Sequence, residues 1–338
     1  MQKLTPPLTG PFLVSQAPRD IATQRRAIQV RGLLGPLVSS LLREEDVTDI
    51  MRNEDGILRA TRFGEPTRVV GQMSDRDADA LIAAVASTHG TSVTAEKPGI
   101  EGELVGGGER FTGLVPPVVV SPVFAIRKPA SQVFPLADYV RKAVLTERQA
   151  ALLEQAVVNH KNIAVVGGTG AGKSTLLNAL LEAGGRLTPQ DRVAVIEQLR
   201  ELQCPFADRV MLRLTDTFDE QAAIRKALRL FINRIIVGEV RGPEALAMLM
   251  AWNTGHDGGF CTFHARTSSP TPRAALERIE QMVALATPAA MQRTIGSAID
   301  LIVCLERRAD GIRRVSQIAT VHGWDDARND YRLNLEGC

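Results

Sequence analysis

A glycine-rich run that ends in lysine and serine is the part of the chain best suited to chemistry. Residues 167–174 read Gly-Gly-Thr-Gly-Ala-Gly-Lys-Ser, which matches the pattern GxxxxGK followed by Ser or Thr in full. Glycines let backbone N–H groups turn inward around phosphate oxygens, and the helix expected after the loop directs its positive end to the same point. The run therefore predicts a nucleotide-binding loop made of Gly167, Gly168, Thr169, Gly170, Ala171, Gly172, Lys173, Ser174 and Thr175.

Two side chains of this loop have separate roles in the predicted chemistry. Lys173 would reach the β and γ phosphates, and Ser174 would hold Mg²⁺ through its hydroxyl. ATP and Mg²⁺ are thus the expected cofactors. The alternative is a glycine-rich turn that binds nothing, but an apolar strand pattern precedes the loop and an apolar helix pattern follows it, as nucleotide binding requires.

Two acidic residues at the ends of apolar strand patterns are candidates for the hydrolytic step. Glu239 follows the strand pattern that begins at Arg234, and we expect it to activate water or to order the water shell of the metal. Glu197 ends a similar run that begins at Val193, so it could be a second acid facing the same phosphates. The alternative for each is a surface glutamate at a strand end. Glu201 reads equally well as part of a solvated charged loop.

Histidine and arginine side chains could complete the site. His264 ends a further strand pattern and could sense the γ phosphate through a hydrogen bond, whereas His256 is equally consistent with a structural role. Metal binding by the two histidines alone is poorly supported, because no third ligand lies at a suitable spacing. Arg110 and Arg127 lie in apolar, strand-like surroundings and could reach a phosphate across a domain cleft, as arginine fingers do. From composition alone, surface charge is the simpler interpretation of both.

The elements that would position these residues fall into two parts. Residues 1–30 are expected to form a tail, residues 31–135 a small α+β domain, and residues 136–145 a linker. Over residues 146–338 short apolar strands alternate with helix patterns, which predicts a parallel sheet covered by helices on both faces. The expected fold class is therefore α/β, with a RecA-like P-loop domain that follows the smaller α+β domain.

Composition argues against several other classes of protein. The 338 residues carry a formal net charge of +2 and only 4% aromatic side chains, so electrostatic binding and base stacking of nucleic acid are poorly supported. The four cysteines are far apart and lack metal-ligand spacing, which favours reduced thiols. No run reaches the ~18 apolar residues expected of a spanning helix, and the N-terminus lacks the apolar core of a signal peptide.

Four short segments share their order along the chain with one protein family. Residues 235–246 look like its Walker B region, and the stretch 251–265 looks like its histidine box. Residues 108–111 and 124–129 are similar to N-terminal segments of its conjugal transfer, TrbB-like branch. On these segments the chain resembles the secretion ATPase superfamily that powers type II and type IV secretion, pili and conjugation, and the resemblance covers about residues 32–325.

The resemblance implies a homohexameric ring of two-domain subunits on the cytoplasmic face of the inner membrane. Its partners would be inner-membrane components of a secretion or conjugation apparatus, and no direct nucleic-acid binding is expected. Nucleotide would sit between the two domains, so that Arg110 and Arg127 become phosphate contacts. ATP binding and hydrolysis would then drive domain movements that assemble a pilus or gate a transfer channel.

The chain departs from the family pattern at two places. Residues 197–201 read Glu-Gln-Leu-Arg-Glu, where the family's aspartate box has two acids followed by Thr-Arg-Glu, and residues 231–233 read Phe-Ile-Asn in place of Arg-Pro-Asp. The tetracysteine zinc site of many type II secretion ATPases is absent, which favours the conjugal or type IV branch. Because Lys173 and Glu239 are intact, we expect an ATP-hydrolysing motor. The alternatives are a nucleotide-gated assembly subunit with little turnover and a nucleic-acid translocase.

Overall fold

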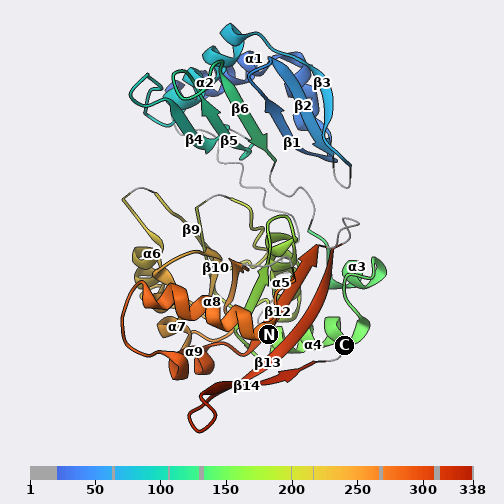
Figure 1. Cartoon of the computed structure of the whole chain (residues 1–338), viewed down its shortest axis with the longest axis vertical. Coiled ribbons are helices and arrows are strands. Elements are labelled where there is room, and N and C mark those ends of the chain that lie inside the picture. The colour runs from blue at the N-terminus through green and yellow to red at the C-terminus, as the bar shows by residue number, and fades with distance from the viewer. Residues whose placement is uncertain are drawn as a thin grey trace, which may run out of the picture. The chain divides into compact units, whose positions relative to one another are not determined.

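The chain folds into two compact units, each with a hydrophobic core of its own (Figure 1). A computed structural model describes residues 21–62, 65–105, 107–128, 133–198, 200–215, 217–265, 269–307 and 313–336. The N-terminal unit is Met1–Pro129 and the C-terminal unit is Ala130–Cys338. The α/β class predicted from the sequence is confirmed, and both sheets contain antiparallel pairs of strands.

The N-terminal unit, over its described residues, is a six-stranded antiparallel sheet with two helices. Strand order is β3-β2-β1-β6-β5-β4, and every neighbouring pair is antiparallel. Both helices lie on one face of the sheet, where their apolar side chains share one core with the strands (Figure 1). In chain order the elements are α1 (Ile21–Arg43), β1 (Val47–Arg52), β2 (Ile57–Arg62), β3 (Arg68–Gln72), α2 (Asp75–Thr88), β4 (Gly99–Glu103), β5 (Arg110–Leu114) and β6 (Val123–Arg127).

Helix α1 begins earlier than the predicted tail over residues 1–30 allows. The chain is helical from Ile21 onward, and residues 1–20 lie outside the described residues. Gly35 has a φ of +70° and precedes Pro36, so the helix is kinked there. Buried apolar residues at helical spacing hold the helix against the sheet on both sides of this kink; they are Val30, Leu34, Val38 and Leu41.

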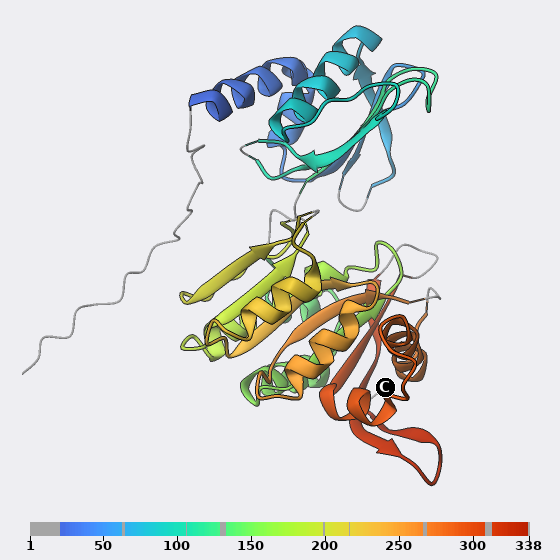
Figure 2. The same cartoon turned by 90° about the vertical axis from the view of Figure 1, so that its left-hand side faces the viewer.

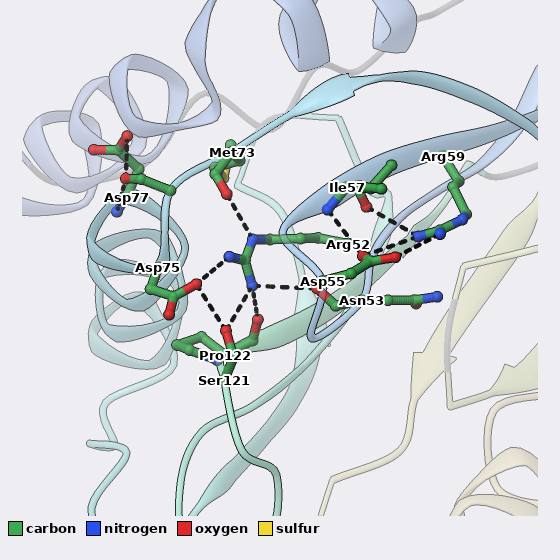
Figure 3. A network of polar contacts seen from close by, with 11 residues as sticks. Arg52, Asn53, Asp55, Ile57, Arg59, Met73, Asp75, Asp77, Ser121 and Pro122 are labelled. Atoms are coloured by element: carbon green, nitrogen blue, oxygen red, sulfur yellow. Dashed lines mark hydrogen bonds and ion pairs between the residues drawn. The ribbon is translucent and has the colours of Figure 1, made fainter.

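A buried arginine joins three segments of the N-terminal unit (Figure 3). Arg52, which ends β1, is only 1% exposed. Its Nε donates a hydrogen bond to Met73 O at 3.0 Å, just before α2, and its Nη1 donates to Ser121 Oγ at 3.4 Å, just before β6. The same guanidinium also bonds Pro122 O and pairs with Asp75. One cation therefore fixes the start of α2 and the entry into β6 relative to β1.

The C-terminal unit is built around a mixed sheet of eight strands over its described residues. Strand order is β14-β13-β12-β7-β11-β10-β8-β9. From β12 to β9 all neighbours are parallel, whereas β13 and β14 add antiparallel pairs at one edge, where their hairpin projects (Figure 2). The helices are α3 (Leu136–Arg141), α4 (Glu147–Val158), α5 (Lys173–Leu187), α6 (Glu220–Ala227), α7 (Glu244–Trp252), α8 (Pro272–Ala284) and α9 (Gln292–Ala298). The strands are β7 (Ile163–Gly167), β8 (Val193–Glu197), β9 (Arg209–Arg213), β10 (Arg234–Val240), β11 (Phe260–His264), β12 (Leu301–Arg307), β13 (Arg313–Asp325) and β14 (Asp330–Leu335).

Helices cover both faces of this sheet, as the alternation of strands and helices predicts. Successive residues of β7 point to opposite faces: Ile163 packs with α3, α4 and α5, and Ala164 packs with α6 to α9. All five residues of β7 and of β8 are buried. Strands buried on both faces need continuous apolar runs, and the sequence supplies them over residues 163–166 and 193–196.

The segment expected as a linker, residues 136–145, is folded into the C-terminal unit. It contains α3, and its Leu136 and Leu145 are buried in the core beneath α4 and α5. Val144 O also accepts a hydrogen bond from the N–H of Val315 on β13 at 2.9 Å. The prolines around this segment suggested a linker, but its apolar residues lie at the spacing of a short helix and find a core to fill.

Replacing Arg52 tests how strongly the N-terminal unit depends on this cation. Arg52→Ala removes the donor from the carbonyl oxygens of Met73 and Pro122. We expect the free energy of unfolding in a urea titration to fall by about 3 kcal/mol. Arg59→Ala is the matched control, since it removes only the exposed pair with Asp55 and a local hydrogen bond to Ile57 O, and should have little effect. Equal losses in the two variants would contradict the role assigned to Arg52.

Candidate functional site

The predicted phosphate loop joins the end of β7 to the start of α5. Gly170 has a φ of +72° and Gly172 a φ of +96°, values that side-chain-bearing residues rarely adopt. A methyl group on Gly167 would lie 2.9 Å from Leu305 O on the neighbouring strand β12. Backbone conformation and close packing thus explain three of the glycines in the motif.

Lys173 is the first residue of α5, and its side chain is largely buried at 8% exposure. Its ammonium donates a hydrogen bond to Gly168 O at 3.2 Å, and it lies 3.3 Å from His264 Nδ1. Burial lowers the pKa of Lys173, while the carboxylates of Glu239 and Glu201 act in the opposite direction. The cation is therefore held inside the loop by groups from other strands.

Glu239 and His264 reach the loop because their strands are neighbours of β7. Strand β11 lies between β7 and β10, and its last residue, His264, is opposite Gly167 in the parallel register. His264 Nε2 lies 2.8 Å from Glu239 Oε1, and the other carboxylate oxygen of Glu239 pairs with Arg241. The carboxyl ends of parallel strands lie at the same end of the sheet. Glu239 and His264 therefore converge with the phosphate loop there, although they follow Gly167 by 72 and 97 positions in the sequence.

The contacts of His264 define the position of its proton. An ammonium has donors only, so Nδ1 must accept the hydrogen bond from Lys173, and the proton of the neutral ring is on Nε2, toward Glu239. Partial burial lowers the pKa of His264, the Lys173 cation lowers it further, and Glu239 opposes both. These surroundings disfavour the charged form of the ring, which links Lys173 to Glu239.

Glu197 and Glu201 occupy the turn that follows β8. Glu201 Oε2 accepts a hydrogen bond from Ser174 Oγ at 2.9 Å, so its carboxylate lies against the predicted metal ligand. Glu197 Oε2 accepts the N–H groups of Glu201 and Leu202, each at 3.0 Å. Glu197, expected to face the phosphates, thus uses one oxygen to hold the turn that carries Glu201. The sequence signals for Glu201 are its spacing of four residues from Glu197 and its match to the last glutamate of the family's aspartate box.

Ser174 and Glu201 supply the oxygen atoms that Mg²⁺ prefers. No group of three or more His, Cys, Asp or Glu residues that could hold a metal ion by itself occurs in the part of the chain that the structure describes. Mg²⁺ commonly keeps several waters and is held by few protein groups together with phosphate oxygens, which a hydroxyl and a nearby carboxylate can accompany. The residues present therefore fit a magnesium ion that enters with a nucleotide.

The remaining candidates lie away from the loop or in the other unit. His256 precedes β11, at the amino ends of the strands, whereas His264 lies at their carboxyl ends. The Nδ1 atom of His256 is 2.9 Å from Ile232 O, which supports a structural role for this histidine. Arg110 and Arg127 are directly opposite each other on β5 and β6 of the N-terminal unit. Arg127 Nε also pairs with Asp49 Oδ1 at 2.7 Å, so the two arginines share one row across the sheet.

A titration of His264 tests the electrostatics of the site. Its pKa should lie below the ordinary value of 6.5, as followed by NMR with His264→Gln to assign the signal. Lys173→Ala should raise the pKa, since the ammonium that opposes an imidazolium is gone, although burial still holds it down. Lys161→Ala is the matched control, because Lys161 pairs with Asp300 at the amino ends of the strands, away from His264. An unchanged pKa in Lys173→Ala would refute the contact.

No helix of the described chain is both long and apolar enough to cross a membrane.

A family model described as "Type II/IV secretion system protein" matches residues 110–329. The probable conjugal transfer protein TrbB of Sinorhizobium fredii is 43% identical over 295 residues, which cover 87% of this chain and 89% of the relative. The conjugal transfer protein TrbB of Rhizobium radiobacter is 42% identical over 291 residues, with coverages of 86% and 88%.

Solved structures show the same fold at low sequence identity. The pilus retraction motor PilT with bound ADP is 19% identical, has a TM-score of 0.60, and is aligned over 90% of this chain and 83% of its own. The Legionella pneumophila ATPase DotB is 17% identical, with a TM-score of 0.54 and coverages of 91% and 81%. The family resemblance predicted from the sequence is confirmed by the family model and the relatives: the chain belongs to the type II/IV secretion system protein family.

Proposed function

We propose that the chain is an ATP-hydrolysing motor that acts in a conjugative transfer or type IV secretion system. The observation that carries this proposal is the chain of contacts from Lys173 through His264 to Glu239, at the mouth of a phosphate loop in a member of this family. Relatives named conjugal transfer proteins support the setting, and the names of the solved neighbours, a motor and an ATPase, support the activity. The C-terminal unit is then a RecA-like nucleotide-binding domain.

The loop and its neighbours bind and orient the triphosphate. Backbone N–H groups around Gly170 and Gly172 would bind the phosphates, and Lys173 would supply its ammonium to them. Ser174 would hold Mg²⁺ through its hydroxyl, and Glu201, which accepts a hydrogen bond from Ser174, would order the water around the ion. When bound, Mg²⁺ neutralises charge on the β and γ oxygens.

Glu239 has the position of the residue that activates water. One of its carboxylate oxygens lies 2.8 Å from His264 Nε2 and the other pairs with Arg241, so its orientation is fixed from two sides. A carboxylate held beside the phosphate loop can accept a proton from an attacking water. His264 connects this base to Lys173, so the γ phosphate and Glu239 are coupled through one imidazole.

A second candidate function is a nucleotide-gated assembly subunit with little turnover. The altered aspartate box favours it, because Gln198 and Leu199 stand where the family has an acid and a threonine. In that case ATP would bind and change the assembly of subunits without rapid hydrolysis. Phosphate release separates the two candidates.

The family also guides proposals on assembly and location. We place the chain in a homohexameric ring at the cytoplasmic face of the inner membrane, with membrane components of the apparatus as partners. Arg110 and Arg127 would contact the phosphates from the N-terminal domain, and their side-by-side register supports a joint role. Direct nucleic-acid binding is not part of the proposal.

Phosphate release from ATP with Mg²⁺ tests the motor. Wild-type protein should release phosphate, and Glu239→Gln should retain ATP binding but slow release by about 100-fold, because the proton acceptor is lost. Lys173→Ala should weaken ATP binding by at least about 10-fold, since a charged contact to phosphate is lost.

Lys161→Ala serves as the matched lysine control and should behave as the wild type. Lys161 pairs with Asp300 at the amino ends of the strands, away from the phosphate loop. A wild type that binds ATP but releases no phosphate would reject the motor and leave the nucleotide-gated subunit. A wild type that binds no ATP would reject both.

The arginine pair of the N-terminal unit is tested by the same assay. Arg110→Ala or Arg127→Ala should lower kcat, by as much as roughly 1000-fold if each supports the transition-state charge as an arginine finger. Arg59→Ala removes an arginine from β2 of the same unit, where it pairs with Asp55, and should leave kcat unchanged. Wild-type kcat in both Arg110→Ala and Arg127→Ala would remove these residues from the site.

A further inference from the structure

Two arginines of the C-terminal unit lie against the phosphate loop without a role in the function described so far. Strand β12 runs parallel to β7, and Leu305 is opposite Gly167, the last residue of β7. The strand continues for two more residues, so Arg307 extends beside the loop. On β13, Arg313 is directly opposite Arg307.

Both side chains lie beside the glycines that shape the loop. A methyl group built on Gly170 would lie 3.5 Å from Arg307 Nη1, and one built on Gly172 would lie 3.6 Å from Arg313 Cδ. Alternation along each strand agrees with this placement: Leu305 and Val315 are two residues away and belong to the core beneath α5, the helix that follows the loop. The guanidinium groups therefore stand on the loop side of the hairpin.

Charge distinguishes this face of the hairpin from the opposite one. Glu306 and Arg314 are also directly opposite each other, and they form an ion pair. Arg307 and Arg313 are two like charges in the same arrangement, which is unfavourable between neighbouring strands. Burial lowers the pKa of Arg313, and the nearby Arg307 cation lowers it further. A bound anion would be attracted by both cations.

A buried hydroxyl adds a polar group to the same place. Tyr139 on α3 is 9% exposed, and its hydroxyl has no hydrogen-bond partner among the described residues. It lies near enough to Arg313 to interact with its charge. Buried hydroxyls are nearly always hydrogen-bonded, so an unpartnered one near the Arg313 cation indicates room for a ligand oxygen or water.

We propose that Arg307 and Arg313 form a second cationic wall of the nucleotide site and contact the phosphate groups from the β12–β13 side. The inference rests on the proposed function, because it assigns two further residues to the same ATP site. Guanidinium groups suit this task, since their planar donors match phosphate oxygens in pairs. The loop glycines and Lys173 then hold the phosphates from one side, and the two arginines from another.

The test is the Kd of the full-length protein for ATP, with inorganic pyrophosphate as a competitor. Arg307→Ala and Arg313→Ala should each raise the Kd for ATP by about 10-fold and weaken pyrophosphate competition similarly. Arg307→Lys and Arg313→Lys keep the charge and should recover part of the affinity. Arg328→Ala is the matched control, since the side chain of Arg328 in the β13–β14 turn is 82% exposed.

Each result decides for or against the second wall. A Kd within about twofold of wild type in both alanine variants would overturn it. So would weaker ATP binding with unchanged pyrophosphate competition, since the arginines would then contact the nucleoside. If Lys173→Ala loses ATP while the arginine variants keep it, the nucleotide site stands and only the second wall fails. A wild type that binds no ATP would overturn both.

Discussion

The buried ammonium of Lys173 is the interaction around which the C-terminal unit is arranged. Taking a cation out of water is costly unless other groups compensate it, and its place at the positive end of α5 adds to that cost. Compensation comes from Gly168 O inside the loop, His264 Nδ1 on β11, and the carboxylates of Glu239 and Glu201. The cation and the N-terminus of α5 together make this point suited to receive phosphates.

The order of the parallel strands determines which residues can provide that compensation. Because β11 lies between β7 and β10, its last residue, His264, stands between Lys173 and Glu239. Strand β12 lies on the other side of β7 and carries Arg307 past the loop. The phosphate loop therefore has the carboxylate of Glu239 on the β11 side and the Arg307 cation on the β12 side. Both positions follow from the register of neighbouring strands and not from residues close to the loop in sequence.

Sequence patterns could predict what depends on local chemistry. The phosphate loop is recognisable because its glycines, Lys173 and Ser174 are consecutive, and the apolar runs before Glu239 and His264 mark strand ends. Other features depend on contacts between distant segments. Glu201 reads as a charged loop residue until the turn held by Glu197 brings it to Ser174. The segment of α3 reads as a linker for a similar reason. Its apolar residues are buried by segments that lie far away in the sequence, so their part in the core is visible only in the folded chain.

The altered aspartate box has a physical explanation in the turn after β8. Glu197 holds this turn through the backbone N–H groups of Glu201 and Leu202, and any residue at position 198 leaves those two bonds available. Asn178 on α5 supports the turn from the other side by donating to Glu201 O at 3.0 Å. An acid at position 198 is therefore not needed to place Glu201 beside Ser174. Gln198 also brings one negative charge fewer to a site that must accept a polyanion, which makes the departure compatible with nucleotide binding.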